Sequence, residues 1–175
     1  MVRIGALCVL VLTGALPAAA AELPTRKPGL WELKMSFESR TVGQTIQQCI
    51  DAATDQMMQS SAGPFAAEAC AKRDIQKSGD KTTIDSTCTV GGKTASSRAV
   101  ITGSFDTAYT MTVSSQSEAI PGGAVNMTIV AKWLGPCGKD QKPGDMIMPG
   151  GLKVNILEMR KRIPSPIEPG APPPR

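Results

Sequence analysis

The sequence predicts a mainly β domain: an antiparallel meander that forms a curved sheet or partial barrel, with one or two short helices. Three observations lead to this fold class. Several stretches alternate apolar and polar residues with a period of two, short glycine-rich turns separate them, and four of the five cysteines lie after residue 21. A one-sided sheet with thiols available for cross-linking is typical of a small exported domain.

Residues 1–21 have the composition of a secretory signal peptide. Arg3 provides a positive start, residues 4–16 form a short apolar run, and Ala18 to Ala21 supply a small-residue cleavage site. The run is shorter than the roughly 20 apolar residues that a membrane-spanning helix needs. We therefore expect export, cleavage near Ala20 or Ala21, and a mature chain without a transmembrane segment. Residues 22–163 are expected to form a single domain.

Residues 30–37 form the clearest predicted strand. Its side chains alternate, with Trp31, Leu33, Met35 and Phe37 on one side and Glu32, Lys34 and Ser36 on the other. This pattern predicts a half-buried strand with one solvent-exposed face. Residues 44–49 form a second, weaker strand.

Residues 50–60 predict a short helix after the second strand. Asp51 is suited to the N-cap position, because its carboxylate can accept hydrogen bonds from the free amide groups of the first turn. The alanine, glutamine and methionine residues that follow favour helix. Gly63-Pro64 is expected to end it.

A series of hairpins follows the helix and raises the expected number of strands to between six and eight. The predicted strands are 71–77, 81–90, 93–102, 109–117 and 124–134. Glycine-rich turns join them, as in an antiparallel meander. The last two strands alternate clearly, and Tyr109, Met111, Val113, Val125, Met127 and Ile129 fall on their apolar sides.

The region after the meander is expected to be mostly irregular. Residues 140–151 contain Pro-Gly pairs and predict a loop. Asn155 and Glu158 resemble a capping box, so residues 156–162 predict a short helix. Residues 164–175 are Pro-rich, and we expect them to form a disordered tail.

Cys49, Cys70, Cys88 and Cys137 predict two disulfides in the mature domain, because Cys8 leaves with the signal peptide. Cys70 and Cys88 lie equally far from Gly79, so a three-residue turn there places them opposite each other and leaves Cys49 for Cys137. No two of these cysteines are close in sequence, which disfavours a tetrathiolate zinc site.

A second register of the hairpin around Gly79 stays open at this point. A two-residue Gly79-Asp80 turn would set Ile75 opposite Ile84, so that two apolar side chains would pack against each other in the core. It would also move Cys70 one step away from Cys88 and onto the other face. A bulge near Cys70 reconciles the two demands.

Composition argues against several functional classes. The chain has no histidine, which excludes catalytic triads and metal sites that depend on this residue. The net charge of +4 comes from basic residues scattered among carboxylates, unlike the clustered charge of nucleic-acid binders. The S-x-x-K match at residues 78–81 and the G-G-K-T segment at 91–94 are better explained as turns. We expect no cofactor and no metal.

Five sequence features together resemble a known family. They are Lys27-Pro28-Gly29-Leu30-Trp31-Glu32, Cys49-Ile50-Asp51 before a helix, Cys70 and Cys88 flanking a glycine turn, Thr102-Gly103-Ser104-Phe105, and Trp133-Leu134-Gly135-Pro136-Cys137. Over about residues 23–138 the chain is similar to domain-of-unknown-function family 3617, small exported proteins of Gram-negative bacteria. The resemblance implies a periplasmic location and a mainly β domain, and it supplies no activity.

The functional expectation follows from the size of the apolar face. One short helix is too small to bury the whole apolar face of the sheet. The residues expected on that face are Trp31, Leu33, Met35, Phe37, Tyr109, Met111 and Met127. We therefore expect a non-catalytic binding module for an apolar small molecule or an extended peptide. The alternative is a structural protein of the cell envelope that docks on an envelope partner through a sheet edge or the Pro-rich tail.

Overall fold

The computed structural model describes residues 23–39, 42–61, 70–90, 92–118 and 123–162. The predicted signal peptide at 1–21, the helix stop at Gly63-Pro64 and the predicted disordered tail at 164–175 lie outside these ranges. The described residues are mostly β, as the sequence predicted.

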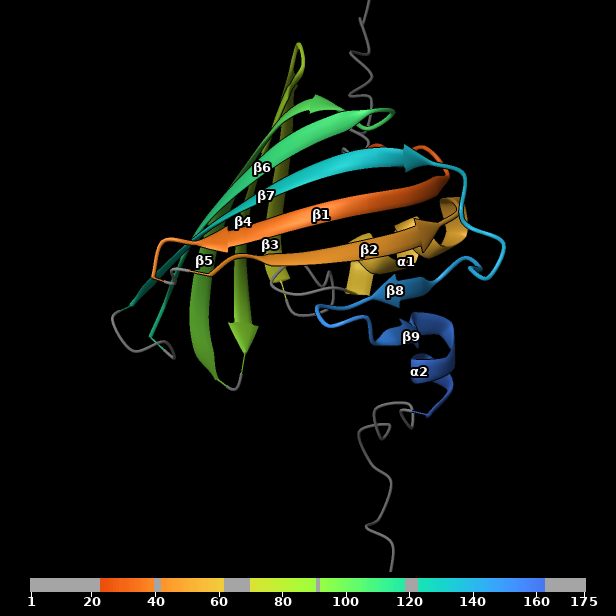
Figure 1. Cartoon of the computed structure of the whole chain (residues 1–175). Coiled ribbons are helices and arrows are strands. Elements are labelled where there is room, and N and C mark those ends of the chain that lie inside the picture. The colour runs from red at the N-terminus through yellow and green to blue at the C-terminus, as the bar shows by residue number, and fades with distance from the viewer. Residues whose placement is uncertain (1–22, 40–41, 62–69, 91, 119–122, 163–175) are drawn as a thin grey trace, which may run out of the picture.

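Nine antiparallel strands form one sheet in the order β3-β4-β5-β6-β7-β1-β2-β8-β9. The strands are β1 Gly29–Phe37, β2 Gln44–Ile50, β3 Cys70–Ser78, β4 Lys81–Val90, β5 Lys93–Ser104, β6 Ala108–Ser117, β7 Ala124–Gly135, β8 Asp145–Ile147 and β9 Lys153–Asn155. Strands β3 and β9 lie at opposite ends of this order, so the sheet is not closed into a barrel. Figure 1 shows a strong twist, with β3, β4 and β5 running steeply across the direction of β1 and β2.

Strand register separates the sheet into two faces. Residues that oppose each other in paired strands share a face, and Leu33 opposes both Ile46 and Ala131, while Ala131 also opposes Tyr109. We call the side that carries these residues the inner face and the opposite side the solvent face. The alternation in the sequence therefore predicted correctly which residues of β1, β6 and β7 lie together.

The hydrophobic core is one cluster on the inner face. Its buried members come from β1, β2, β4, β5, β6 and β7: Trp31, Leu33, Ile46, Ile50, Ile84, Ala99, Ile101, Tyr109, Val113 and Ala131. Half-buried methionines from the strands, from the helix after β2 and from residues 146–148 pack against it. The inner face thus supplies the core of the whole domain.

The helix α1, Ala52–Ser61, begins two residues later than the sequence predicted. Ile50 ends β2 and is buried in the core, so burial keeps it in the strand. Asp51 is the N-cap: its Oδ1 accepts from the backbone N–H of Thr54 at 2.8 Å. Hydrogen bonds from the backbone and hydroxyl of Thr54 lower the pKa of Asp51, against the raising effect of burial.

The hairpin of β3 and β4 has the register of the two-residue turn, and a bulge near Cys70 lets it keep the Cys70–Cys88 pair as well. Ser78 opposes Lys81 across a two-residue turn, and Ile75 opposes Ile84 in the core. A register shift between Cys70 and Lys72 restores the pairing of Cys70 with Cys88. The three-residue turn is therefore wrong, and the bulge near Cys70 is confirmed.

Two disulfides join Cys70 to Cys88 and Cys49 to Cys137. This is the pairing that the sequence favoured. Cys137 follows β7, and its bond to Cys49 holds the end of the meander against β2. No helix among the described residues is long and apolar enough to cross a membrane.

The region at 140–151 is not only a loop, contrary to the prediction. It contains β8, which opposes β2 through Gln47 and Gln48 and is itself paired with β9. Each of these strands has three residues, too few to produce a visible alternation. Pairing defines them as strands, since β8 pairs with β2 and β9 pairs with β8.

The terminal helix α2, Ile156–Arg162, has the bounds that the sequence predicted. Asn155 caps it, since its Oδ1 accepts from the backbone N–H groups of Leu157 and Glu158 at 3.0 and 3.2 Å.

Candidate functional site

The seven residues predicted for apolar ligand contact share the inner face. Met35 opposes Ile129, which opposes Met111, and Phe37 opposes Met127, which opposes Val113. Leu33 and Tyr109 are joined through Ala131 in the same way. The structure therefore brings residues of β1, β6 and β7 together as the alternation predicted.

Burial divides these seven residues into two groups. Trp31, Leu33 and Tyr109 are 0%, 8% and 6% exposed, and they belong to the closed part of the core. Met35, Phe37, Met111 and Met127 are only half-buried. The accessible part of the inner face is therefore a patch of flexible methionines and one phenylalanine beside a rigid aromatic region.

A buried polar cluster lies against Trp31. The guanidinium carbon of Arg26 is 5.7 Å from the Trp31 ring centroid, and Arg26 Nε donates to Asp55 Oδ1 at 2.7 Å. The backbone N–H of Arg26 and the side-chain amide of Gln59 donate to Asp55 Oδ2 at 2.7 and 2.8 Å. These bonds attach the segment before β1 to helix α1.

Two atoms beside Trp31 are buried without a hydrogen-bond partner: Arg26 Nη1 and Gln48 Oε1. Gln48 opposes Trp31 in the register of β1 and β2. The Tyr109 ring is stacked on Phe105 at 5.0 Å between centroids. Burial raises the pKa of Tyr109, and the positive charge of Arg26 only partly opposes this effect. Tyr109 is therefore a neutral phenol and not an activated base.

The inner face has a polar row at its other end. Ser86, Ser97 and Ser115 oppose one another across β4, β5 and β6, and Arg73 of β3 opposes Ser86. The hydroxyl oxygens of Ser86 and Ser97 are 2.8 Å apart. Arg73 Nε is buried and has no hydrogen-bond partner. This row was not predicted from the sequence. The signal for it is the spacing of Arg73, which lies two residues before Ile75 and so falls on the apolar side of β3.

A hydroxyl-rich groove of about 760 Å³ lies across β3 to β7. Its lining includes the solvent-face residues Asp74, Thr87, Ser96, Ser114 and Asn126, and also Ser86, Ser97 and Ser115 of the polar row. Arg98 binds Asp85 in the middle through two contacts of 2.7 and 3.1 Å. The hydrogen bond from Arg98 lowers the pKa of the Asp85 carboxyl, and the charge of Arg98 adds to this effect. Asp85 is thus paired with Arg98, and the pairing favours its ionised form.

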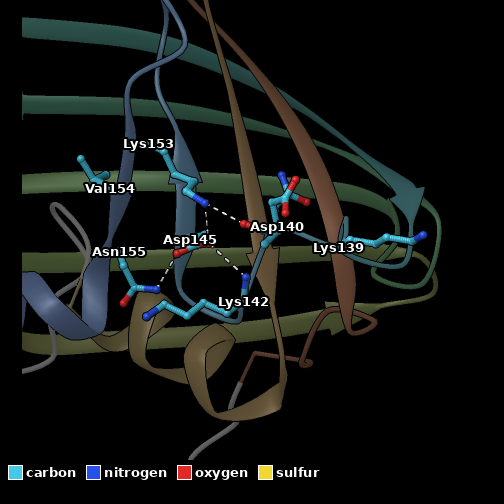
Figure 2. Close-up of a pocket in the computed structure, with 8 residues that line it drawn as sticks. Lys139, Asp140, Lys142, Asp145, Lys153, Val154 and Asn155 are labelled. Atoms are coloured by element: carbon cyan, nitrogen blue, oxygen red, sulfur yellow. Dashed lines mark hydrogen bonds and ion pairs between the residues drawn. The ribbon is translucent and has the colours of Figure 1, made fainter.

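A smaller hollow of about 440 Å³ lies beside β8 and β9. Figure 2 shows the Asp145 carboxylate between Asn155, Lys142 and Lys153, while Lys139 extends away from it. Asp145 accepts from Asn155 Nδ2 at 2.7 Å and from the Lys142 backbone N–H at 3.0 Å, and Lys153 Nζ is 3.7 Å away. Each carboxylate oxygen accepts one hydrogen bond, so Asp145 links β8 to β9 and to the loop before β8.

The described residues show no group of three or more His, Cys, Asp or Glu side chains that could hold a metal ion. Asp74 and Asp85 oppose each other on the solvent face. Asp85 is held by Arg98, and Asp74 accepts from Gln76 Nε2 at 2.8 Å. Both carboxylates are engaged by side-chain donors, and the pKa of Asp85 is lowered, whereas a general acid needs a raised one.

Comparison with protein families decides the assignment of the domain. Residues 26–137 match the family model described as protein of unknown function, DUF3617. The chain belongs to this family. The DUF3617 match begins at Arg26 and ends at Cys137, so it includes the buried Arg26–Asp55 pair, the inner face and both disulfides. Strands β8 and β9, helix α2 and the Asp145 hollow lie after it.

No curated protein and no solved structure matches the chain significantly. The functional argument for this DUF3617 member therefore depends on its own residues.

Proposed function

We propose that this DUF3617 member is an exported, non-catalytic protein whose inner face binds the apolar part of a small molecule. One observation carries the proposal: Met35, Met111 and Met127 lie half-buried on the inner face of the sheet, next to a rigid Trp31–Tyr109 core. Methionine is flexible and polarisable, so it adapts to irregular apolar ligands.

An acyl-type chain fits this face better than an extended peptide does. A peptide strand needs partners for its backbone amides, usually a free sheet edge. The half-buried middle of the inner face offers only apolar side chains to a ligand. Of the two free edges, β9 has three residues, and β3 carries the charged residues Arg73, Asp74 and Lys77, typical of a protected edge.

Export is supported by the composition of residues 1–21 and by the two disulfides. Disulfides persist in oxidising compartments such as the bacterial periplasm. The absence of histidine from the sequence and the engagement of the Asp74 and Asp85 carboxylates favour a binding role over catalysis.

Tryptophan fluorescence tests the proposal directly, because Trp31 lies at the inner face. The purified protein, with both disulfides formed, is titrated with acyl-chain ligands of increasing length. We expect a saturable change in emission, and we expect Met111→Gln to weaken binding by about ten-fold because it removes apolar contact. Thr112→Gln is the matched control, since Thr112 is the next residue and lies on the solvent face.

Circular dichroism must show that both variants retain the β spectrum. If no acyl-chain ligand changes the emission, or if both variants weaken binding equally, the inner face is not the binding site. Saturable binding of extended peptides alone would favour the peptide alternative instead.

A further inference from the structure

We propose that Arg73 and the row of Ser86, Ser97 and Ser115 bind the anionic head of an amphiphile. Its acyl chain then lies along the adjacent apolar rows of the inner face. This inference rests on the proposed function and adds the charge of the ligand and its direction in the site.

Arg73 lies on the inner side of the sheet and has no charged partner within the part of the chain that the structure describes. It opposes Ser86, which is 4% exposed, and so it projects to the same face as the core. Its Nε atom is buried without a hydrogen-bond partner, and no carboxylate among the described residues forms an ion pair with it. A buried guanidinium nitrogen without a partner is costly, and a bound anion removes this cost.

The serine row extends the site across three neighbouring strands. Each hydroxyl can donate to an anion as well as accept, and its hydrogen can rotate to suit a ligand. Ser86 and Ser97 already contact each other at 2.8 Å, which leaves one hydroxyl hydrogen of the pair free to point elsewhere. Ser115 opposes Ser97 and adds a third hydroxyl.

Apolar side chains begin two residues further along every strand of this row. One apolar residue from each strand, β3 to β7, opposes its neighbour in this row: Ile75, Ile84, Ala99, Val113 and Met127. Two residues along a strand correspond to about 7 Å. A head group held by Arg73 therefore places the first carbons of its chain against this row, and Met111 and Ile129 lie on the next row.

The comparison with Arg98 shows why Arg73 is the anion site. Arg98 lies on the solvent face of β5, and Asp85 already occupies its guanidinium with two contacts. Arg26, which also borders the inner face, is paired with Asp55. Arg73 has neither kind of partner among the residues that the structure describes, so its charge is available to a ligand.

Three ligands with the same dodecyl chain test the inference: one with a carboxylate, one with a phosphate and one with a hydroxyl head. Binding is followed by tryptophan fluorescence, below the concentration at which the ligands form micelles. We expect the two anionic ligands to bind at least about ten-fold more tightly than the alcohol, since charge-assisted hydrogen bonds are the stronger kind. A further preference between carboxylate and phosphate identifies the head group.

Arg73→Gln should remove the preference for anionic heads and leave binding of the alcohol unchanged. Arg98→Gln, the matched control on the other face, should keep the preference. Equal binding of all three ligands by the unaltered protein, or an unchanged preference in Arg73→Gln, overturns the head-group site and leaves the proposed function standing. If none of the three ligands binds, both proposals fail.

Discussion

Two buried aspartates hold outlying segments to the sheet, and they do so differently. Asp55, at 0% exposure, binds the segment before β1 to helix α1. Asp145, at 4% exposure, binds the loop after β7 to β9. Asp55 lies within the DUF3617 match, and Asp145 lies after it.

The partners of the two carboxylates differ in charge and in access to water. Asp55 is paired with Arg26, whose side chain is itself buried, so that the whole ion pair is removed from solvent. Asp145 is held by the neutral Asn155 amide and a backbone N–H, and its cation, Lys153, is half exposed. A carboxylate deep in the core therefore needs a full counter-charge, whereas one near the surface can be satisfied by neutral donors.

The largest expected effect comes from breaking the buried pair. Asp55→Leu leaves the Arg26 guanidinium buried without a counter-charge, and we expect it to lower the free energy of unfolding by about 3 to 5 kcal/mol. Urea denaturation of the disulfide-bonded protein measures this loss.

The double variant Arg26→Met with Asp55→Leu sharpens the comparison. It removes both charges, so it should regain most of the lost stability, apart from the cost of the Arg26 backbone N–H, which loses its acceptor. If the double variant is no more stable than Asp55→Leu, the loss comes from packing around α1 and not from an uncompensated charge.

A smaller effect is expected at the second aspartate. Asp145→Asn keeps the size of the side chain but weakens the hydrogen bonds from Asn155 and Lys142, and we expect a loss of about 1 to 3 kcal/mol. Hydrogen exchange should locate the change in β8, β9 and α2, with the amides of β4 to β7 unaffected. A loss as large as that of Asp55→Leu would contradict the proposed difference between the two sites.

The dependence of stability on pH gives a third comparison. Burial alone would raise the pKa of Asp145, but hydrogen bonds from Asn155 and Lys142 and the charges of Lys153 and Lys142 outweigh it and lower the pKa below 3.8. The ionised form is thus favoured in the folded state. The stabilisation is complete above the unfolded pKa and is lost as the pH falls through the lower, folded pKa.

Unfolding measured between neutral pH and about pH 2 should therefore show an acid-sensitive component that Asp145→Asn removes. The same profile in the variant and the unaltered protein would show that Asp145 does not contribute to it.

The smallest effect is expected on the solvent face. Arg98→Gln breaks the exposed pair with Asp85, and exposed ion pairs contribute little because water and salt screen them. We expect a change in the urea midpoint that is barely measurable and that disappears at high salt. A large shift would mean that the solvent-face groove has a structural role.

The sequence was sufficient for features that depend on local patterns. Alternation placed Trp31, Met111 and Met127 on one face, because side chains of a strand alternate whatever surrounds them. Local geometry also gave the Asp51 cap and the helix after Asn155. Cys70 and Cys88 lie equally far from Gly79, whereas Ile75 and Ile84 favour a two-residue turn. These two demands together predicted the bulge near Cys70.

Tertiary structure alone decided the features that depend on distant partners. Strand β8 forms because β2 offers it hydrogen bonds, and β9 forms against β8; three residues carry no periodic signal of their own. Arg26 and Asp55 are 29 positions apart in the chain, and no local rule pairs them. The amino-acid sequence by itself determined which residues face the core, while only the folded sheet decided which polar groups are satisfied there and that the described residues leave Arg73 Nε without a hydrogen-bond partner.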